Sequence, residues 1–186
     1  MSTRIDIEHT EISEGYEPPL PVRLIASTVR AWALAGGVLA LGLAVMTAGS
    51  AISNLTIGRP FAADHELVKH LIAIVVFTFL PYCQLIGANV TVDIFTEGMR
   101  DRAKAAMASI ASLLAIGLAV LLMRQMWLGF GSYLRFVEVT PVLGLPLWTA
   151  FPPILISLVL LVFAALVTLA NALRGVLGHA SWQLGD

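Results

Sequence analysis

Four long segments without a charged residue limit the possible folds of this chain more than any other feature. They cover residues 31–58, 71–92, 105–123 and 139–173 of the 186-residue sequence. A helix needs about 20 predominantly apolar residues to cross the hydrocarbon core of a bilayer. Because lipid offers no hydrogen bonds to the backbone, each segment is expected to form an α-helix.

The overall composition also favours a membrane over water. Hydrophobic residues make up 58% of the chain and charged residues 12%, whereas a soluble domain is about 25% charged. So few charges cannot cover a water-facing surface, and the lipid bilayer is the expected surrounding. The formal net charge of −1 offers no electrostatic footprint for a nucleic-acid partner. The predicted class is therefore an all-α integral membrane protein.

The charge gaps and prolines divide the chain into a leader, a membrane domain and a tail. We expect residues 1–21 to be an acidic, proline-ended leader, residues 22–173 a four-span membrane domain, and residues 174–186 a short tail. The expected spans cover about residues 34–56, 71–92, 105–127 and 152–173. Pro146 and Trp148 belong to the connector before the fourth span. The first gap begins too late and runs too long for the apolar region of a cleaved signal peptide.

Basic residues predict the orientation of these spans. Seven lysines and arginines fall on the side that holds both termini and four on the other side. Cytoplasmic loops are enriched in lysine and arginine, so we expect both termini in the cytoplasm.

Residues 22–32 combine an apolar stripe, which includes Trp32, with a basic stripe that contains Arg23 and Arg30. This pattern is typical of an N-terminal amphipathic helix lying in the headgroup layer. The same residues fit equally well as the first turns of the first span. Both interpretations remain open from the sequence.

Small residues recur at four-residue intervals in the first and third spans. They are Gly36, Ala40, Ala44 and Ala48, followed by Ala111, Ala115 and Ala119. Such rows let helices approach closely, and close packing drives association in lipid. We therefore predict that these rows pack against partner helices, whether in this chain or in another.

The second span contains the most polar groups. Asp64 and Glu66 lie in its first turn, where the helix dipole favours acids. Gln84 is the deepest polar residue, and Asn89 and Asp93 lie near the cytoplasmic exit. Hydrogen bonding between helices is favoured over a substrate or ion site, because no full charge lies in the middle of the span.

The end of the third span resembles an interfacial belt. Arg124 and Trp127 are the expected membrane-interface residues there. A more specific hypothesis is that Arg124 or Arg135 forms an ion pair with Glu66 or Glu138, since all four belong to the same side of the expected topology.

Sequence motifs of catalysis and cofactor binding are missing. The chain has no Walker A, G-x-G-x-x-G, H-E-x-x-H or G-x-S-x-G pattern. His65 and His70 are five residues apart and do not share one helical face, so haem ligation has little support. We expect no catalytic residue, metal ligand or cofactor, and an accessory membrane subunit in place of an enzyme. Two alternatives stay open: a haem- or quinone-binding anchor subunit of a respiratory enzyme, and a small carrier acting as a homodimer.

Three stretches, taken in order, resemble a known family. They are residues 64–67 (DHEL), residues 87–93 (GANVTVD), and residues 140–148 with Leu-Pro-Leu-Trp at their end. Their order and spacing resemble the small, DctQ-type membrane subunit of tripartite ATP-independent periplasmic (TRAP) transporters. Glu66 and Asp93 match the family pattern, whereas Asn89 and Thr91 replace a histidine and a basic residue that relatives often carry.

The resemblance implies a role in the bacterial inner membrane. Members of this family act with a large multi-span membrane subunit, which carries the substrate and sodium, and with a periplasmic solute-binding protein, which delivers an organic anion. The small subunit is then expected to brace the static scaffold of the large one.

Overall fold

The computed structural model describes residues 19–87 and 101–177. In this part of the chain it contains four α-helices: α2 (Leu20–Ile57), α3 (Asp64–Leu85), α5 (Asp101–Arg135) and α6 (Phe151–Val176). The 3-10 helix η2 (Leu147–Ala150) leads directly into α6. All four α-helices are long and apolar enough to cross a membrane. This confirms the all-α fold class with four spans.

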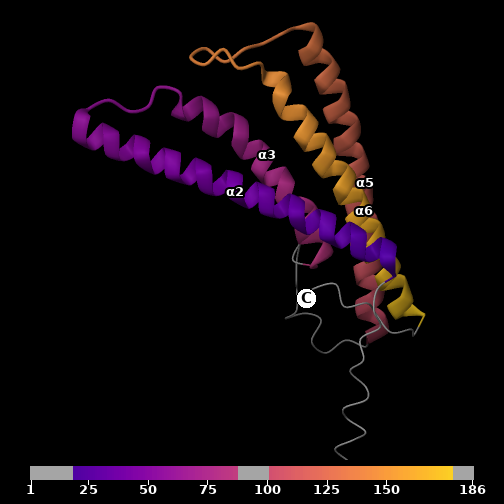
Figure 1. The fold of residues 1–186 in the computed structure, drawn as a ribbon. Helices are drawn as coiled ribbons and strands as arrows, with labels where there is room; N and C mark the ends of the chain where they lie inside the picture. The colour runs from indigo at the N-terminus through magenta and orange to yellow at the C-terminus, as the bar shows by residue number, and fades with distance from the viewer. Residues whose placement is uncertain (1–18, 88–100, 178–186) are drawn as a thin grey trace, which may run out of the picture.

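The helices stand in a row, in the order α2, α3, α6, α5 (Figure 1). Helix α3 packs against both α2 and α6, and α6 packs against α5 along most of its length. In its most apolar stretch α6 is 39% buried and α5 is only 11% buried. Helix α6 therefore forms the centre of the row, and α5 forms an edge with most of its surface uncovered.

Consecutive helices run in opposite directions. Helices α2 and α5 begin at the end of the molecule where α3 and α6 finish (Figure 1). At that end Val22 and Val29 of α2 form a buried cluster with Leu85 of α3 and Ala164 and Val167 of α6. The first half of α2 therefore crosses the α3–α6 pair, whereas its second half packs on α3 alone.

The buried face of α2 follows a seven-residue repeat. Its members are Val22, Val29, Gly36, Leu43 and Ser50. A repeat of seven keeps one seam facing a neighbouring helix, as in a coiled coil. Val22 and Val29 of the 22–32 segment lie on this seam, and the segment continues without a break into the rest of α2. They are therefore the first turns of the first helix, and the structure forms no separate amphipathic helix from them.

The second helix is placed earlier than its expected span of about residues 71–92. It begins at Asp64 and ends at Leu85. Gly87 has φ +69°, in the left-handed region that glycine adopts after helix ends. The N–H groups of Ile86 and Gly87 bond back to the carbonyls of Tyr82 and Gln84, and this turn stops the helix.

Candidate functional site

Glu66 fastens the connection between α5 and α6 to the start of α3. We call this connection the 136–147 loop; it contains a single β-bridge between Val139 and Pro146. The Glu66 carboxylate accepts the backbone N–H of Val142 on Oε1 at 2.8 Å and that of Leu143 on Oε2 at 3.0 Å. One side chain from the α2–α3 pair thus holds the far end of the α5–α6 pair.

A second hydrogen bond fastens the same end of the molecule. His70 Nε2 lies 2.9 Å from Thr149 Oγ1 in η2, and Thr149 Oγ1 in turn donates to the carbonyl of Pro146. Pro146 and Trp148 are half-buried here. The family-like residues around Leu-Pro-Leu-Trp therefore form the contact surface between η2 and α3.

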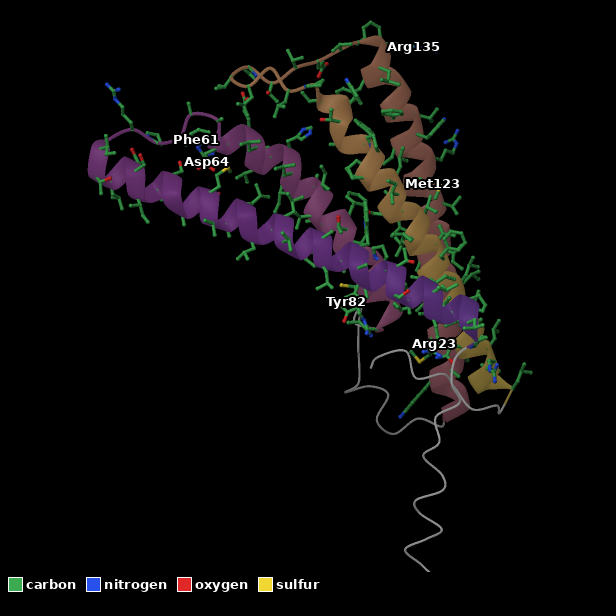
Figure 2. All side chains as sticks on the ribbon, viewed as in Figure 1. Arg23, Phe61, Asp64, Tyr82, Met123 and Arg135 are labelled. Atoms are coloured by element: carbon green, nitrogen blue, oxygen red, sulfur yellow. The ribbon has the colours of Figure 1, made fainter. Side chains whose placement is uncertain are left out.

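The turn between α2 and α3 is closed by further hydrogen bonds, one of which runs from Ser53 Oγ to the carbonyl of Arg59 at 2.9 Å. Asp64 is buried, and its Oδ1 accepts the hydroxyl of Thr47 at 3.3 Å. The backbone N–H of Phe61 donates to Ser50 Oγ at 3.1 Å. Figure 2 labels Phe61 and Asp64 at the connection between the two helices. These contacts explain how an acidic first turn is accommodated at the start of an apolar helix.

A buried polar cluster joins three helices near their other end. Gln84 Nε2 of α3 donates to Thr168 Oγ1 of α6 at 3.1 Å, and Ser112 Oγ of α5 lies 3.2 Å from the same oxygen. Because the Thr168 hydroxyl donates to the carbonyl of Ala165, Ser112 is the donor in its pair. Each of these bonds ends on a neighbouring helix or on the backbone, which is what a packing contact requires.

A side-chain hydrogen bond joins α2 to α6. Trp32 Nε1 donates to Ser157 Oγ at 2.9 Å, and Ser157 is buried. The indole of Trp32, which we expected in the membrane interface, therefore points its polar atom into the contact between α2 and α6. Arg23 and Arg30 are exposed, and Figure 2 shows Arg23 at the end where α2 begins.

The two rows of small residues turn between inner contacts and the outer surface. Gly36 and Ala119 are buried, Ala40 and Ala115 are half-buried, and Ala44, Ala48 and Ala111 are exposed. The reason is geometric: a step of four residues rotates by about 40° on a helix with 3.6 residues per turn. Along the chain, the row on α2 therefore leaves the internal contact and the row on α5 enters it.

The expected ion pair of the third span does not form within residues 19–87 and 101–177. Both carboxylate oxygens of Glu66 are occupied by backbone N–H groups. Arg124 lies exposed on α5, and Trp127 is 65% exposed beside Phe130. Asn89 and Asp93 lie outside the described residues.

Sequence reasoning missed four of the residues that join the helices: His70, Ser112, Thr149 and Ser157. Their partners lie 56 to 125 residues away in the chain, so no local pattern identifies them. The one available signal was that polar side chains in apolar helices usually face protein.

No metal site is found among the residues that the structure describes, by the criterion of three or more clustered His, Cys, Asp or Glu. His65 is exposed, and His70 makes the contact with Thr149 given above.

A comparison with protein families identifies the chain's relatives. The model of the family described as "Tripartite ATP-independent periplasmic transporters, DctQ component" matches residues 43–175. The chain belongs to this family. The matched region includes the second part of α2 from Leu43 onwards, all of α3 and α5, and α6 except its last residue. No curated protein and no solved structure matches the chain.

Membership of the DctQ family makes this chain a component of a membrane transporter. Together with the four spanning helices, it indicates a multi-pass protein of the inner membrane. The Glu66 contact lies in one of the stretches on which the resemblance was first based.

Proposed function

We propose that this DctQ component is the scaffold subunit of a TRAP-type transporter. In this role it braces a large multi-span membrane subunit, which carries out sodium-coupled uptake of an organic anion delivered by a periplasmic binding protein. The family match over residues 43–175 is the observation that carries the proposal.

The helix arrangement supports a bracing role. The row α2, α3, α6, α5 offers two broad apolar faces, and its central charge-free segments contain no acid or base with which to bind an ion. The buried polar groups of the Gln84 cluster are bonded to one another and to the backbone. A carrier usually needs an ionisable group inside the membrane, so the moving parts are assigned to the larger subunit.

We assign to the large subunit the exposed part of the small-residue row on α2, which contains Ala44 and Ala48. Ala44 and Ala48 lie outside the α2–α3 contact, and Gly42 and Gly49 have no atom of the chain within 4 Å of an added Cβ. Ala44 and Ala48 share one face of α2, whereas Gly42 and Gly49 share another about 130° away. The face with Ala44 and Ala48 allows another helix to approach closely.

The proposed orientation places both termini in the cytoplasm. The expected topology assigns seven basic residues to the side of both termini (Arg4, Arg23, Arg30, Arg100, Arg102, Lys104 and Arg174) and four to the other side (Arg59, Lys69, Arg124 and Arg135). Basic residues favour the cytoplasmic side, so the 136–147 loop is assigned to the periplasmic side.

Co-purification tests the proposal. The tagged chain, expressed with the large membrane subunit of its own operon and extracted in mild detergent, is expected to elute with that subunit in one complex. A chain that elutes alone, while the large subunit is present and folded, contradicts the scaffold role.

A further inference from the structure

The 136–147 loop combines two properties that do not suit a loop surrounded by water. Several of its apolar side chains are uncovered, and the backbone N–H groups of residues 140–147 are bonded within the molecule. The uncovered side chains are those of Phe136, Val137, Val139, Val142 and Leu143, with exposed fractions from 41% to 73%.

Every backbone N–H from Thr140 to Leu147 donates a hydrogen bond, and the two prolines in this stretch have none to donate. Four of these N–H groups bond within the loop, at 2.9 to 3.0 Å. The other two, at Val142 and Leu143, reach no acceptor in the loop and are taken by Glu66. The Glu66 carboxylate, which lies outside the loop, thus pairs the last two N–H groups of residues 140–147.

Water would satisfy these N–H groups without any such arrangement. In an apolar surrounding, an unpaired N–H costs several kcal/mol, which is why non-helical backbone enters lipid only when its polar groups are satisfied. The complete N–H pairing from Thr140 to Leu147, beside the uncovered side chains of Val142 and Leu143, is therefore what contact with lipid requires. The N–H groups of residues 137–139 donate no hydrogen bond within the described residues, so the fit to lipid is that of the tip.

The carbonyl groups of the loop indicate how deep it lies. Those of residues 141–144 accept no hydrogen bond from the described residues. In the hydrocarbon core they would carry a large cost, whereas headgroups and water can reach them at the boundary between headgroups and acyl chains. The loop thus suits this boundary.

Helix length is compatible with the same depth. Helix α5 has 35 residues, or about 52 Å at 1.5 Å per residue, against roughly 40–45 Å for a bilayer with its headgroups. A tilt of about 30–40°, within the usual range, places its end at Arg135 in the headgroup layer. Figure 1 shows the loop leaving α5 sideways, over the start of α3, instead of continuing along the helix axis.

We propose that the 136–147 loop is a membrane-surface anchor, whose apolar side chains lie in the boundary layer of the lipid. Glu66 permits this placement because it pairs the two N–H groups at the tip. The proposal does not depend on the transport role or on which side of the membrane the loop occupies.

The test measures the depth of the loop in vesicles. In a Cys83→Ala background, Val142→Cys is labelled with an environment-sensitive nitrobenzoxadiazole dye. The full chain is reconstituted, alone and with its large subunit, in vesicles of phosphatidylethanolamine and phosphatidylglycerol that carry spin labels at the headgroup or along the acyl chain. Glu66→Gln replaces one acceptor oxygen by a donor, and Asp64→Asn is the matched control, because the side chain of Asp64 bonds to Thr47 of α2 and not to the loop.

The proposal predicts blue-shifted emission, with quenching by labels near the headgroup and by labels high on the acyl chain, both for the chain alone and for the complex. Glu66→Gln is expected to shift the emission towards its value in water and to weaken the quenching, whereas Asp64→Asn changes neither. Folding of Glu66→Gln is judged by circular dichroism and elution volume. If this variant does not fold, the depth of the loop measured with Glu66 intact tests the proposal by itself.

Three results would overturn the proposal. Emission as in water would show that the loop is hydrated. Quenching that disappears when the large subunit joins would show that a protein covers the loop. A well-folded Glu66→Gln chain with unchanged quenching would show that the carboxylate is not needed for this placement.

Discussion

Gly36→Ala should weaken the packing of α2 on α3 because the added methyl group has no space. An ideal Cβ at this position lies 2.6 Å from Thr78 Cγ2 and 2.8 Å from Thr78 Cβ. Thr78 cannot easily turn away, because it is buried and its hydroxyl bonds to the carbonyl of Ile74. To regain an ordinary contact of 3.4 Å, the methyl group and Cγ2 must separate by about 0.8 Å.

Two opposing effects set the size of the change. Overpacking a contact of this kind costs roughly 1–3 kcal/mol, whereas replacing a helical glycine by alanine gains about 0.8–1.0 kcal/mol of helix propensity. Gly42→Ala has the same propensity effect without the clash, since no atom lies within 4 Å of its added methyl group. The difference between the two variants isolates the packing cost, and we expect it to be about 1–3 kcal/mol.

The assay is equilibrium unfolding of the purified chain in mixed micelles with increasing sodium dodecyl sulfate, followed by tryptophan fluorescence. Gly36→Ala should unfold at lower dodecyl sulfate than Gly42→Ala. In a Thr78→Gly background, which removes both contacting carbons, the Gly36→Ala cost should shrink. Equal midpoints for Gly36→Ala and Gly42→Ala would refute the proposed close contact between α2 and α3.

Three further changes test other contacts. Trp32→Phe removes the bond to Ser157 and is expected to lower the unfolding free energy by about 0.5–1.5 kcal/mol, measured in the same micelles; no loss would mean that the bond adds nothing. Thr168→Val removes the oxygen that Gln84 and Ser112 share, and the unfolding free energy is expected to fall by roughly 1–3 kcal/mol. A change near zero would contradict this. Ala44→Leu lies outside the internal contacts, so it should leave the unfolding midpoint of the chain unchanged and lower the yield of the complex with the large subunit; undiminished yield would argue against that surface.

The four spans could be predicted because charge is so costly in lipid. The charge-free segments at residues 31–58, 71–92, 105–123 and 139–173 each overlap a helix of the structure. The cost of burying a charge exceeds every local preference, so the pattern is visible without knowledge of the contacts.

The packing seam could not be predicted with the same success. The sequence shows a row of small residues four apart that begins at Gly36. The structure instead buries residues seven apart, in a seam that passes through the same glycine. In a soluble helix the polar face reveals which side is buried. In α2 nearly every side is apolar, so the sequence lacks the contrast that would distinguish the two faces.

The Glu66 contact was only partly predictable. Its place in the first turn of a span follows from the helix dipole, and the resemblance to the DctQ family emphasised the same residue. Its partners are backbone N–H groups of Val142 and Leu143, which carry no signature in the sequence. We therefore expected an arginine as its partner, and the structure instead uses the loop.

The measurement that tests the central claim most directly is uptake into proteoliposomes under a sodium gradient. The solute bound by the periplasmic protein of the same operon is supplied together with that protein. Vesicles with this chain alone are expected to show no uptake above empty vesicles, and vesicles with both membrane subunits are expected to accumulate the solute. Uptake by this chain alone would contradict the account. So would full uptake by the large subunit when this chain is left out.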